Sequence, residues 1–213
     1  MKKKINPAIL VETFSELEKE VDALLQVTNE FDIDLIDWKR TKLKTLKVIE
    51  AIELNRFAII HYDVMMDDAR ETVHILIESK TASRIIVNME SDYAIQPLLN
   101  KIKEAGIQTG ISLNPENTAK QAIKYFPYVD FIQIMTIEPG LQGNPFIESR
   151  LGLSIELREL GYEGMIGVDG GVDSKTIPII KKYPIDTLSI GSSFSRAPDP
   201  SFAYKNLMEI FTS

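Results

Sequence analysis

The chain has 213 residues, of which 44% are hydrophobic and 26% charged, a composition typical of a soluble globular domain. Its net charge of -7 argues against nucleic acid as a partner, and the lack of cysteine excludes disulfides, thiolate metal ligands and a cysteine nucleophile. No apolar run approaches the ~18 residues of a membrane span, and the first residues lack the pattern of a secretory signal. We therefore expect one domain over residues 1–213, in the cytoplasm and without a membrane partner.

Short β-rich runs alternate with amphipathic runs of helical length along the whole chain. This alternation predicts strands at residues 5–10, 32–37, 57–64, 84–88, 108–112, 130–136, 164–168 and 186–190. The intervening and following patterns predict helices at 13–27, 41–54, 67–80, 92–105, 116–125, 145–160, 173–182 and 200–211. Gly106 and Gly161 are typical of residues that end helices, and Asp173-Ser174 is typical of a helix start.

Eight strand–helix units with short connections predict a parallel sheet, and eight such units close into a (β/α)₈ TIM barrel. An open, doubly wound sheet is the structural alternative, and it often carries a glycine fingerprint after its first strand. The first predicted strand here ends in Ile9-Leu10-Val11-Glu12, which contains no glycine. The sequence therefore favours the α/β TIM barrel.

Glycine-containing turns follow the last three predicted strands. Glycine lets the main chain approach an anion closely, and the start of a helix after such a turn presents free N–H groups. The alternative is that these glycines only allow the chain to turn. We expect phosphate-binding groups at the following positions: Gly140, Gly143, Gly170, Gly171, Gly191 and Ser192.

Two carboxylates stand at the ends of predicted strands that lie on different sides of the barrel. Asp37 ends the second strand, and Asp169 ends the seventh. Such carboxylates could approach one substrate from opposite faces, as inversion at a carbon next to a carbonyl requires. The alternative is that each aspartate only caps the helix that follows.

The last three strands also carry a family resemblance. Residues 132–147, 167–172 and 189–194 resemble the sixth-, seventh- and eighth-strand motifs of ribulose-phosphate 3-epimerases. Pro7-Ala8-Ile9-Leu10 and Ser112-Leu113-Asn114-Pro115 resemble the first and fifth strands, so the similarity covers nearly the whole chain. The resemblance implies a ribulose-phosphate-binding barrel, a phosphorylated ketose as substrate and a homo-oligomer. It also implies a divalent ion (Zn, Mn, Fe or Mg) held by two histidines and two aspartates, and two aspartates that exchange the C3 proton.

Under this resemblance, Asp37 matches the catalytic aspartate of the second strand, and Asp169 matches its seventh-strand partner. The metal-binding histidine expected two residues before Asp37 is replaced by Leu35, and the first-strand serine is replaced by Ala8. The third-strand histidine position falls on Asp63 or, with a slip of one residue, on Tyr62.

A reduced metal site would therefore contain Asp37, Asp63, Asp169 and His61, and its oxygen-rich ligands would favour Mg²⁺ or Mn²⁺. Without a metal, Lys39 is a candidate to stabilise the developing negative charge.

Met65 and Met135 match the methionines that line the reacting carbon in the family. His74 lies in a segment similar to the third-strand histidine motif. Because the count of strand–helix units puts it inside the third helix, we expect an ordinary helix-face role.

Three functions are compatible with these patterns. The first is an epimerase that exchanges the C3 proton of a ketose phosphate through an enediolate. The second is a sugar-phosphate lyase or decarboxylase, suggested by the Asp-x-Lys form of Asp37-Trp38-Lys39. The third is a degenerate barrel that binds phosphosugars with little or no turnover, suggested by Leu35 and Ala8.

Overall fold

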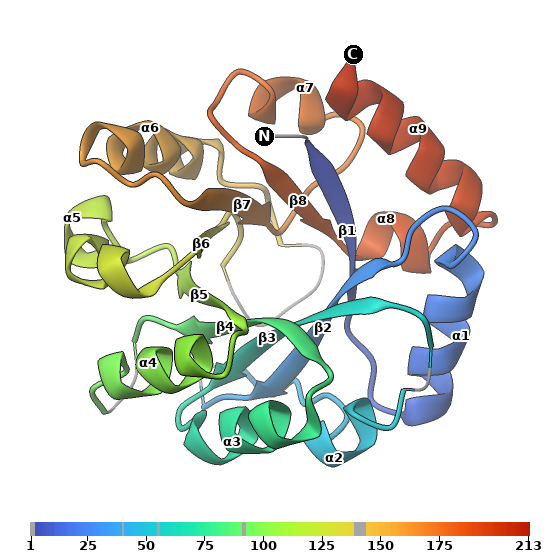
Figure 1. Ribbon diagram of the computed structural model, residues 1–213. Helices are drawn as coiled ribbons and strands as arrows, with labels where there is room; N and C mark the ends of the chain where they lie inside the picture. The colour runs from blue at the N-terminus through green and yellow to red at the C-terminus, as the bar shows by residue number, and fades with distance from the viewer. Residues whose placement is uncertain (1–2, 40, 55, 91–92, 139–143) are drawn as a thin grey trace.

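Eight parallel strands form a closed barrel surrounded by helices in this computed structural model, which describes residues 3–39, 41–54, 56–90, 93–138 and 144–213 (Figure 1). Each strand pairs with its neighbours in chain order, and β8 pairs with β1 to close the ring. The predicted TIM barrel is confirmed, and the open sheet is wrong. The strands are β1 (Lys4–Ile9), β2 (Glu30–Asp37), β3 (Ile59–Met66), β4 (Ala82–Asn88), β5 (Gln108–Leu113), β6 (Phe131–Met135), β7 (Met165–Asp169) and β8 (Thr187–Ile190).

The helices cover the outside of this barrel and are mostly shorter than the sequence predicts (Figure 1). Helix α1 starts in a capping box, in which Thr13 accepts a hydrogen bond from the Glu16 backbone and Glu16 accepts one from the Thr13 backbone. The α-helices are α1 (Phe14–Leu24), α2 (Val48–Ala51), α3 (Arg70–Ser79), α4 (Gln96–Glu104), α5 (Ala119–Ala122), α6 (Gly152–Glu159), α7 (Ile177–Ile180), α8 (Ser192–Ser195) and α9 (Pro200–Thr212), with 3-10 helices η1 (Ile123–Tyr128) and η2 (Glu148–Leu151). No helix in the described ranges has the length and apolar character needed to cross a bilayer.

The helix predicted for residues 41–54 is largely wrong, because only Val48–Ala51 is helical. Residues 41–47, here called the strap, instead run along the end of β2. Lys44 forms an antiparallel bridge with Asp37, and the Ile36 N–H donates to Thr45 Oγ1 at 2.9 Å. The Leu46 N–H donates to the Val11 carbonyl at 2.9 Å, so the strap also binds the chain after β1. These tertiary hydrogen bonds replace the intrahelical bonds that the sequence pattern predicts.

Alternation along the strands divides apolar from polar side chains. On β2 and β3, Ile33, Leu35, Tyr62 and Val64 are fully buried in the main hydrophobic core outside the sheet. The alternate residues of the same strands face the barrel interior, and they are polar towards the middle of the ring: Asp32, Asp34, His61 and Asp63. The barrel interior is therefore rich in buried carboxylates.

Arg150 of η2 fixes the chain at the carboxyl ends of β5 and β6. Its guanidinium is buried and donates to the carbonyls of Leu113, Asn114, Pro115 and Asn117 at 2.7–3.0 Å. One side chain thus satisfies four main-chain acceptors beside the mouth of the barrel.

Candidate active site

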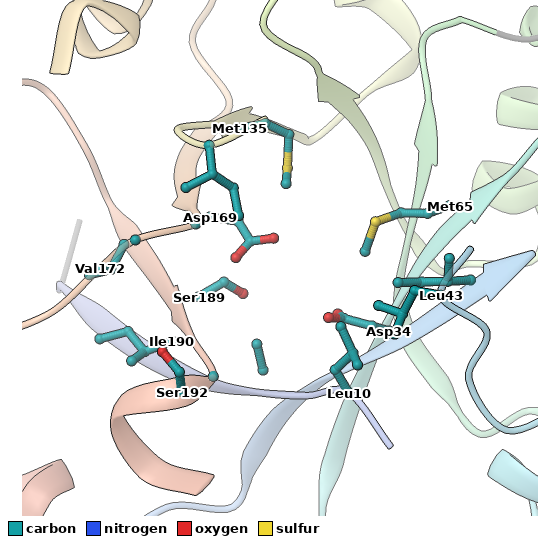
Figure 2. Close-up of a pocket in the computed structure, with 16 residues that line it drawn as sticks. Leu10, Asp34, Leu43, Met65, Met135, Asp169, Val172, Ser189, Ile190 and Ser192 are labelled. Carbon is teal, nitrogen blue, oxygen red and sulfur yellow. The ribbon is translucent and has the colours of Figure 1, made fainter. Parts of the chain in front are cut away.

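A pocket opens at the carboxyl ends of the strands, where active sites of TIM barrels lie. Asp34 of β2 and Asp169 of β7 both line it, and Figure 2 shows their carboxylates pointing into the pocket from opposite sides. The remaining lining residues are Ala8, Leu10, Ile36, Leu43, Met65, Met135, Ile137, Gly170, Gly171, Val172, Ser189, Ile190, Gly191 and Ser192.

Asp37 does not belong to this pocket, so the prediction that it faces Asp169 is wrong. Its side chain is 67% exposed, and its Oδ1 lies 2.8 Å from Lys44 Nζ in the strap. On β2, residues 32, 34 and 36 face inward, whereas 33, 35 and 37 do not. The same alternation puts Leu35 in the core under the helices, away from any position where a metal ligand would be needed.

The sequence does contain a signal for this register. A barrel strand is covered by helices outside, so its outward positions are apolar. Phe31, Ile33 and Leu35 alternate along β2 and lie in the main core, which leaves the intervening Asp32 and Asp34 for the interior. The position of Asp37 as the last residue of the predicted strand obscures this signal.

Burial and like charge change the acidity of the two pocket carboxyls. Burial raises the pKa of Asp169 to about 7, with a contribution from the negative charge of Asp32. Burial also raises the pKa of Asp34 well above its usual range, and the charges of Asp169 and Asp63 act in the same direction. Near neutral pH, one carboxyl of such a pair can hold a proton while the other is ionised.

A buried polar network lies beneath these carboxyls. Asp32 Oδ1 accepts a hydrogen bond from Asn6 Nδ2 at 3.1 Å and lies 2.9 Å from His61 Nδ1, and Asp32 Oδ2 accepts from the Ser189 hydroxyl. Burial opposes ionisation of Asp32, but His61, Arg84 and Ser189 together hold its pKa below the usual range. Asp32 is therefore an ionised carboxylate beneath the two pocket carboxyls, and both of its oxygens are hydrogen-bonded.

The predicted metal ligands do not form one group, although burial and the charge of Asp169 raise the pKa of Asp63; the four residues are Asp37, Asp63, Asp169 and His61. Asp37 is outside the pocket, and His61 is bound to Asp32 and Asn6. Asp63 accepts a hydrogen bond from Gln133. Within the described ranges, no group of three or more histidine, aspartate or glutamate side chains is arranged to hold a metal ion. Among the residues that the structure describes, the site therefore does not fit the metal that the family resemblance implies.

Main-chain turns form the side of the pocket that lies away from Asp34. Gly170 and Gly171 have φ values of 103° and 67°, and a Cβ on Gly170 would lie 2.5 Å from the Ile137 side chain, so both positions favour glycine. Ser192 begins α8, and the first amides of a helix have no intrahelical acceptor. Gly170, Gly171, Gly191 and Ser192 all line the pocket, whereas Gly140 and Gly143 lie outside the described residues.

Met65 and Met135 line the pocket near the two carboxyls, whereas Lys39 and His74 do not (Figure 2). The Lys39 side chain is 79% exposed, and its Nζ lies 3.8 Å from Asp67. His74 lies on α3 and is exposed, as expected for a helix-face residue. Because Asp37 and Lys39 are both outside the pocket, the Asp-x-Lys segment does not form a catalytic pair there.

Comparison with known proteins identifies the family. The model of the ribulose-phosphate 3 epimerase family matches residues 4–195. The chain belongs to this family. A ribulose-phosphate 3-epimerase of Chlamydia pneumoniae is 27% identical over 213 residues, covering 96% of this chain and 93% of that protein. The Helicobacter pylori (strain J99) enzyme is 25% identical with 97% of each chain covered.

The epimerase family also includes a Treponema pallidum relative that is 32% identical over 117 residues, a match spanning about half of each protein. Among solved structures, 3-hexulose-6-phosphate synthase from Salmonella typhimurium superimposes with a TM-score of 0.74 at 17% identity, covering 99% of this chain and 98% of that one. KGPDC from Streptococcus mutans, in complex with a phosphorylated pentose, gives 0.72 at 12% identity, with 97% and 96% covered. At these identities the structural matches show the fold alone.

Proposed function

We propose that the protein inverts C3 of a ketose phosphate, interconverting D-ribulose 5-phosphate and D-xylulose 5-phosphate or a related pair. The observation that carries this proposal is the entry of Asp34 and Asp169 into one pocket from opposite sides of the barrel. Membership of the epimerase family and the names of the relatives support the same reaction.

Two carboxyls in these positions are suited to exchange of the proton on C3. The ionised carboxylate removes that proton, and the C–H electron pair forms a C2–C3 double bond as the carbonyl oxygen becomes an enediolate oxygen. The protonated carboxyl then donates its proton to the opposite face of C3, and the C2 carbonyl reforms. The product differs from the substrate only in the configuration of C3, and the two carboxyls have exchanged protonation states.

The raised pKa values of Asp34 and Asp169 favour a mechanism in which one carboxyl acts as the base and the other as the acid. A general acid or base works best when its pKa lies near the working pH, and burial raises the pKa of Asp169 to about 7. The protonated carboxyl is also a hydrogen-bond donor within the pocket, where negative charge develops. Apolar lining residues, Met65 and Met135 among them, keep water from competing for the transferred proton.

The glycine turns after β7 and β8 supply the proposed phosphate site. Gly170, Gly171, Gly191 and Ser192 lie together at one side of the pocket, and main-chain N–H groups in such turns bind phosphate without a cation. Binding there would hold the sugar with C3 between the carboxyls.

A barrel that binds phosphosugars without turnover is the competing outcome, since the family's metal ligands are not assembled among the described residues. The test is conversion of D-ribulose 5-phosphate, followed by NMR, with D-ribulose as the unphosphorylated control. We expect xylulose 5-phosphate to form and the control to react far more slowly. Thermal stabilisation by ribulose 5-phosphate with no product would favour the binding barrel instead.

A further inference from the structure

Ser189 of β8 connects the pocket to the polar network beneath it. The residue lines the pocket, and Figure 2 shows its hydroxyl oxygen pointing into the cavity beside Asp169. The same hydroxyl donates to Asp32 Oδ2 and forms no other hydrogen bond within the described ranges. Asn6, Asp32 and His61 belong to the same network but do not line the pocket. Ser189 is therefore the member of this network that a bound sugar can contact.

The bond to Asp32 determines what the Ser189 hydroxyl can offer a ligand. A serine hydroxyl has one proton and two lone pairs, whereas an ionised carboxylate can only accept. Asp32 also accepts from Asn6 Nδ2 at 3.1 Å, which leaves it an acceptor on both oxygens. Because the proton of Ser189 is committed to Asp32, its oxygen faces the pocket as an acceptor. Donation to an anion also strengthens that acceptor, since linked hydrogen bonds polarise one another.

Ser189 lies between the reacting carboxyls and the phosphate turns. It pairs in register with Asp169 on the neighbouring strand and precedes Gly191 by two residues. Strands β8 and β1 form the shorter arc of the ring between β7 and β2, which carry the two carboxyls. On this arc, the inward residue that β1 contributes to the pocket is the apolar Ala8. Beneath the turn that contains Ser192, Ser189 is therefore the polar side chain on this side of the pocket.

The two-face reaction brings C4 of the sugar to this side. When Asp34 and Asp169 approach C3 from opposite faces, C2, C4 and the oxygen on C3 lie in the plane between the two carboxyls. The chain from C4 through C5 leads to the phosphate, so binding at the glycine turns directs C4 towards β8. The C2 carbonyl and the C3 oxygen then point away from β8. The hydroxyl on C4 is thus the hydroxyl of the sugar that meets Ser189.

We propose that Ser189 is a specificity-determining residue that accepts a hydrogen bond from the C4 hydroxyl of the substrate. The inference rests on the proposed C3 epimerisation and deepens it, because it restricts the substrate to ketose phosphates that carry a hydrogen-bond donor on C4. An analogue without this hydroxyl leaves the Ser189 acceptor buried and unpaired. Sites built to bind a hydroxyl discriminate against such analogues for this reason.

The test compares D-ribulose 5-phosphate with its 4-deoxy analogue in wild type and Ser189→Ala. Calorimetry measures Kd, and NMR in D₂O measures kcat/KM for deuteration at C3. We expect wild type to bind the hydroxylated sugar about tenfold to a hundredfold more tightly and Ser189→Ala to lose most of this preference. Any difference in C3 acidity between the two sugars is the same for both proteins, so the change in the kcat/KM ratio reports the contact with Ser189.

Matched variants separate this contact from a structural effect of the substitution. Ser189→Thr retains the hydroxyl and should keep the preference. Ser193→Ala removes a hydroxyl that donates to the Val172 carbonyl at 3.2 Å from a residue that does not line the pocket, so the ratio should stay at its wild-type value. If Ser189→Ala fails to fold, Ser189→Cys replaces it, since a thiol is close in size and a weak hydrogen-bonding group.

The outcomes also distinguish this inference from the proposed function. Equal Kd values for the two sugars in wild type, or an unchanged ratio in a folded Ser189→Ala or Ser189→Cys variant, would show that Ser189 does not bind the C4 hydroxyl, even if C3 deuteration occurs. If the Kd ratio depends on Ser189 but neither sugar gains deuterium at C3, the contact is correct and epimerisation is wrong.

Discussion

Three aspartates within one strand have three different environments. Asp32 is ionised in a hydrogen-bonded network, Asp34 lines the pocket, and Asp37 pairs with Lys44 at the surface. The family motifs predict an aspartate from the second strand near the reacting carbon, but residue type alone does not distinguish these three. Only the alternation of inward and outward positions does so, and it shifts the candidate from Asp37 to Asp34.

The raised pKa of Asp169 predicts a pH-dependent cost to stability. Its folded-state pKa of about 7 lies above the value of ~3.9 for an unfolded aspartate, so its contribution to stability is greatest below pH 4 and is lost as the pH rises through 7. We therefore expect Asp169→Asn to be more stable than wild type at pH 8, by on the order of 2–4 kcal/mol, with little difference near pH 4. Urea unfolding at the two pH values measures this.

Asp37→Asn is the matched control for that experiment. Because Asp37 is exposed and its ion pair with Lys44 is at the surface, we expect a change of less than about 1 kcal/mol at both pH values. Equal stabilisation by the two substitutions, or none by Asp169→Asn at pH 8, would contradict the raised pKa of Asp169.

At the scale of elements, the sequence predicts the strands well and the strap poorly. All eight predicted strands overlap observed ones, because their apolar runs are short and flanked by clear breaks. In the strap, Leu43 and Leu46 have a spacing compatible with a helix, yet Leu43 faces the pocket and Leu46 is buried against the chain after β1. Long-range hydrogen bonds to β2 determine this conformation, and no local pattern encodes them.

Thr45 is predicted to fix the strap. In Thr45→Val, the Ile36 N–H loses its side-chain acceptor, which costs about 1–3 kcal/mol when the donor stays buried. We expect faster amide hydrogen exchange at Ile36 and a higher KM for the ketose phosphate, because Leu43 is no longer held in place. Thr45→Ser retains the hydroxyl and should behave like wild type, whereas equal exchange rates in all three proteins would show that this bond does not fix the strap.

For the whole molecule, eight strand–helix alternations are enough to predict a closed barrel. The polar interior is not predictable in this way, since it depends on which side chains meet across the ring. Asp32 of β2 binds Ser189 of β8, and Arg84 of β4 binds Gln108 and stacks on Phe131 at 4.0 Å. The Asp32–Ser189 contact joins strands from the two ends of the chain, and the Arg84 contacts join β4 to the two strands that follow it.

The central claim is that Asp34 and Asp169, and not Asp37, exchange the proton on C3. Its most direct measurement is deuterium incorporation at C3 of a ketose phosphate in D₂O, by NMR, with wild type, Asp34→Asn, Asp169→Asn and Asp37→Asn at equal folded concentrations. Loss of an acid or base typically slows such a step by about 10²–10⁴-fold. We predict losses of that size for Asp34→Asn and Asp169→Asn and near wild-type rates for Asp37→Asn. Exchange that persists in Asp34→Asn but disappears in Asp37→Asn would contradict the account.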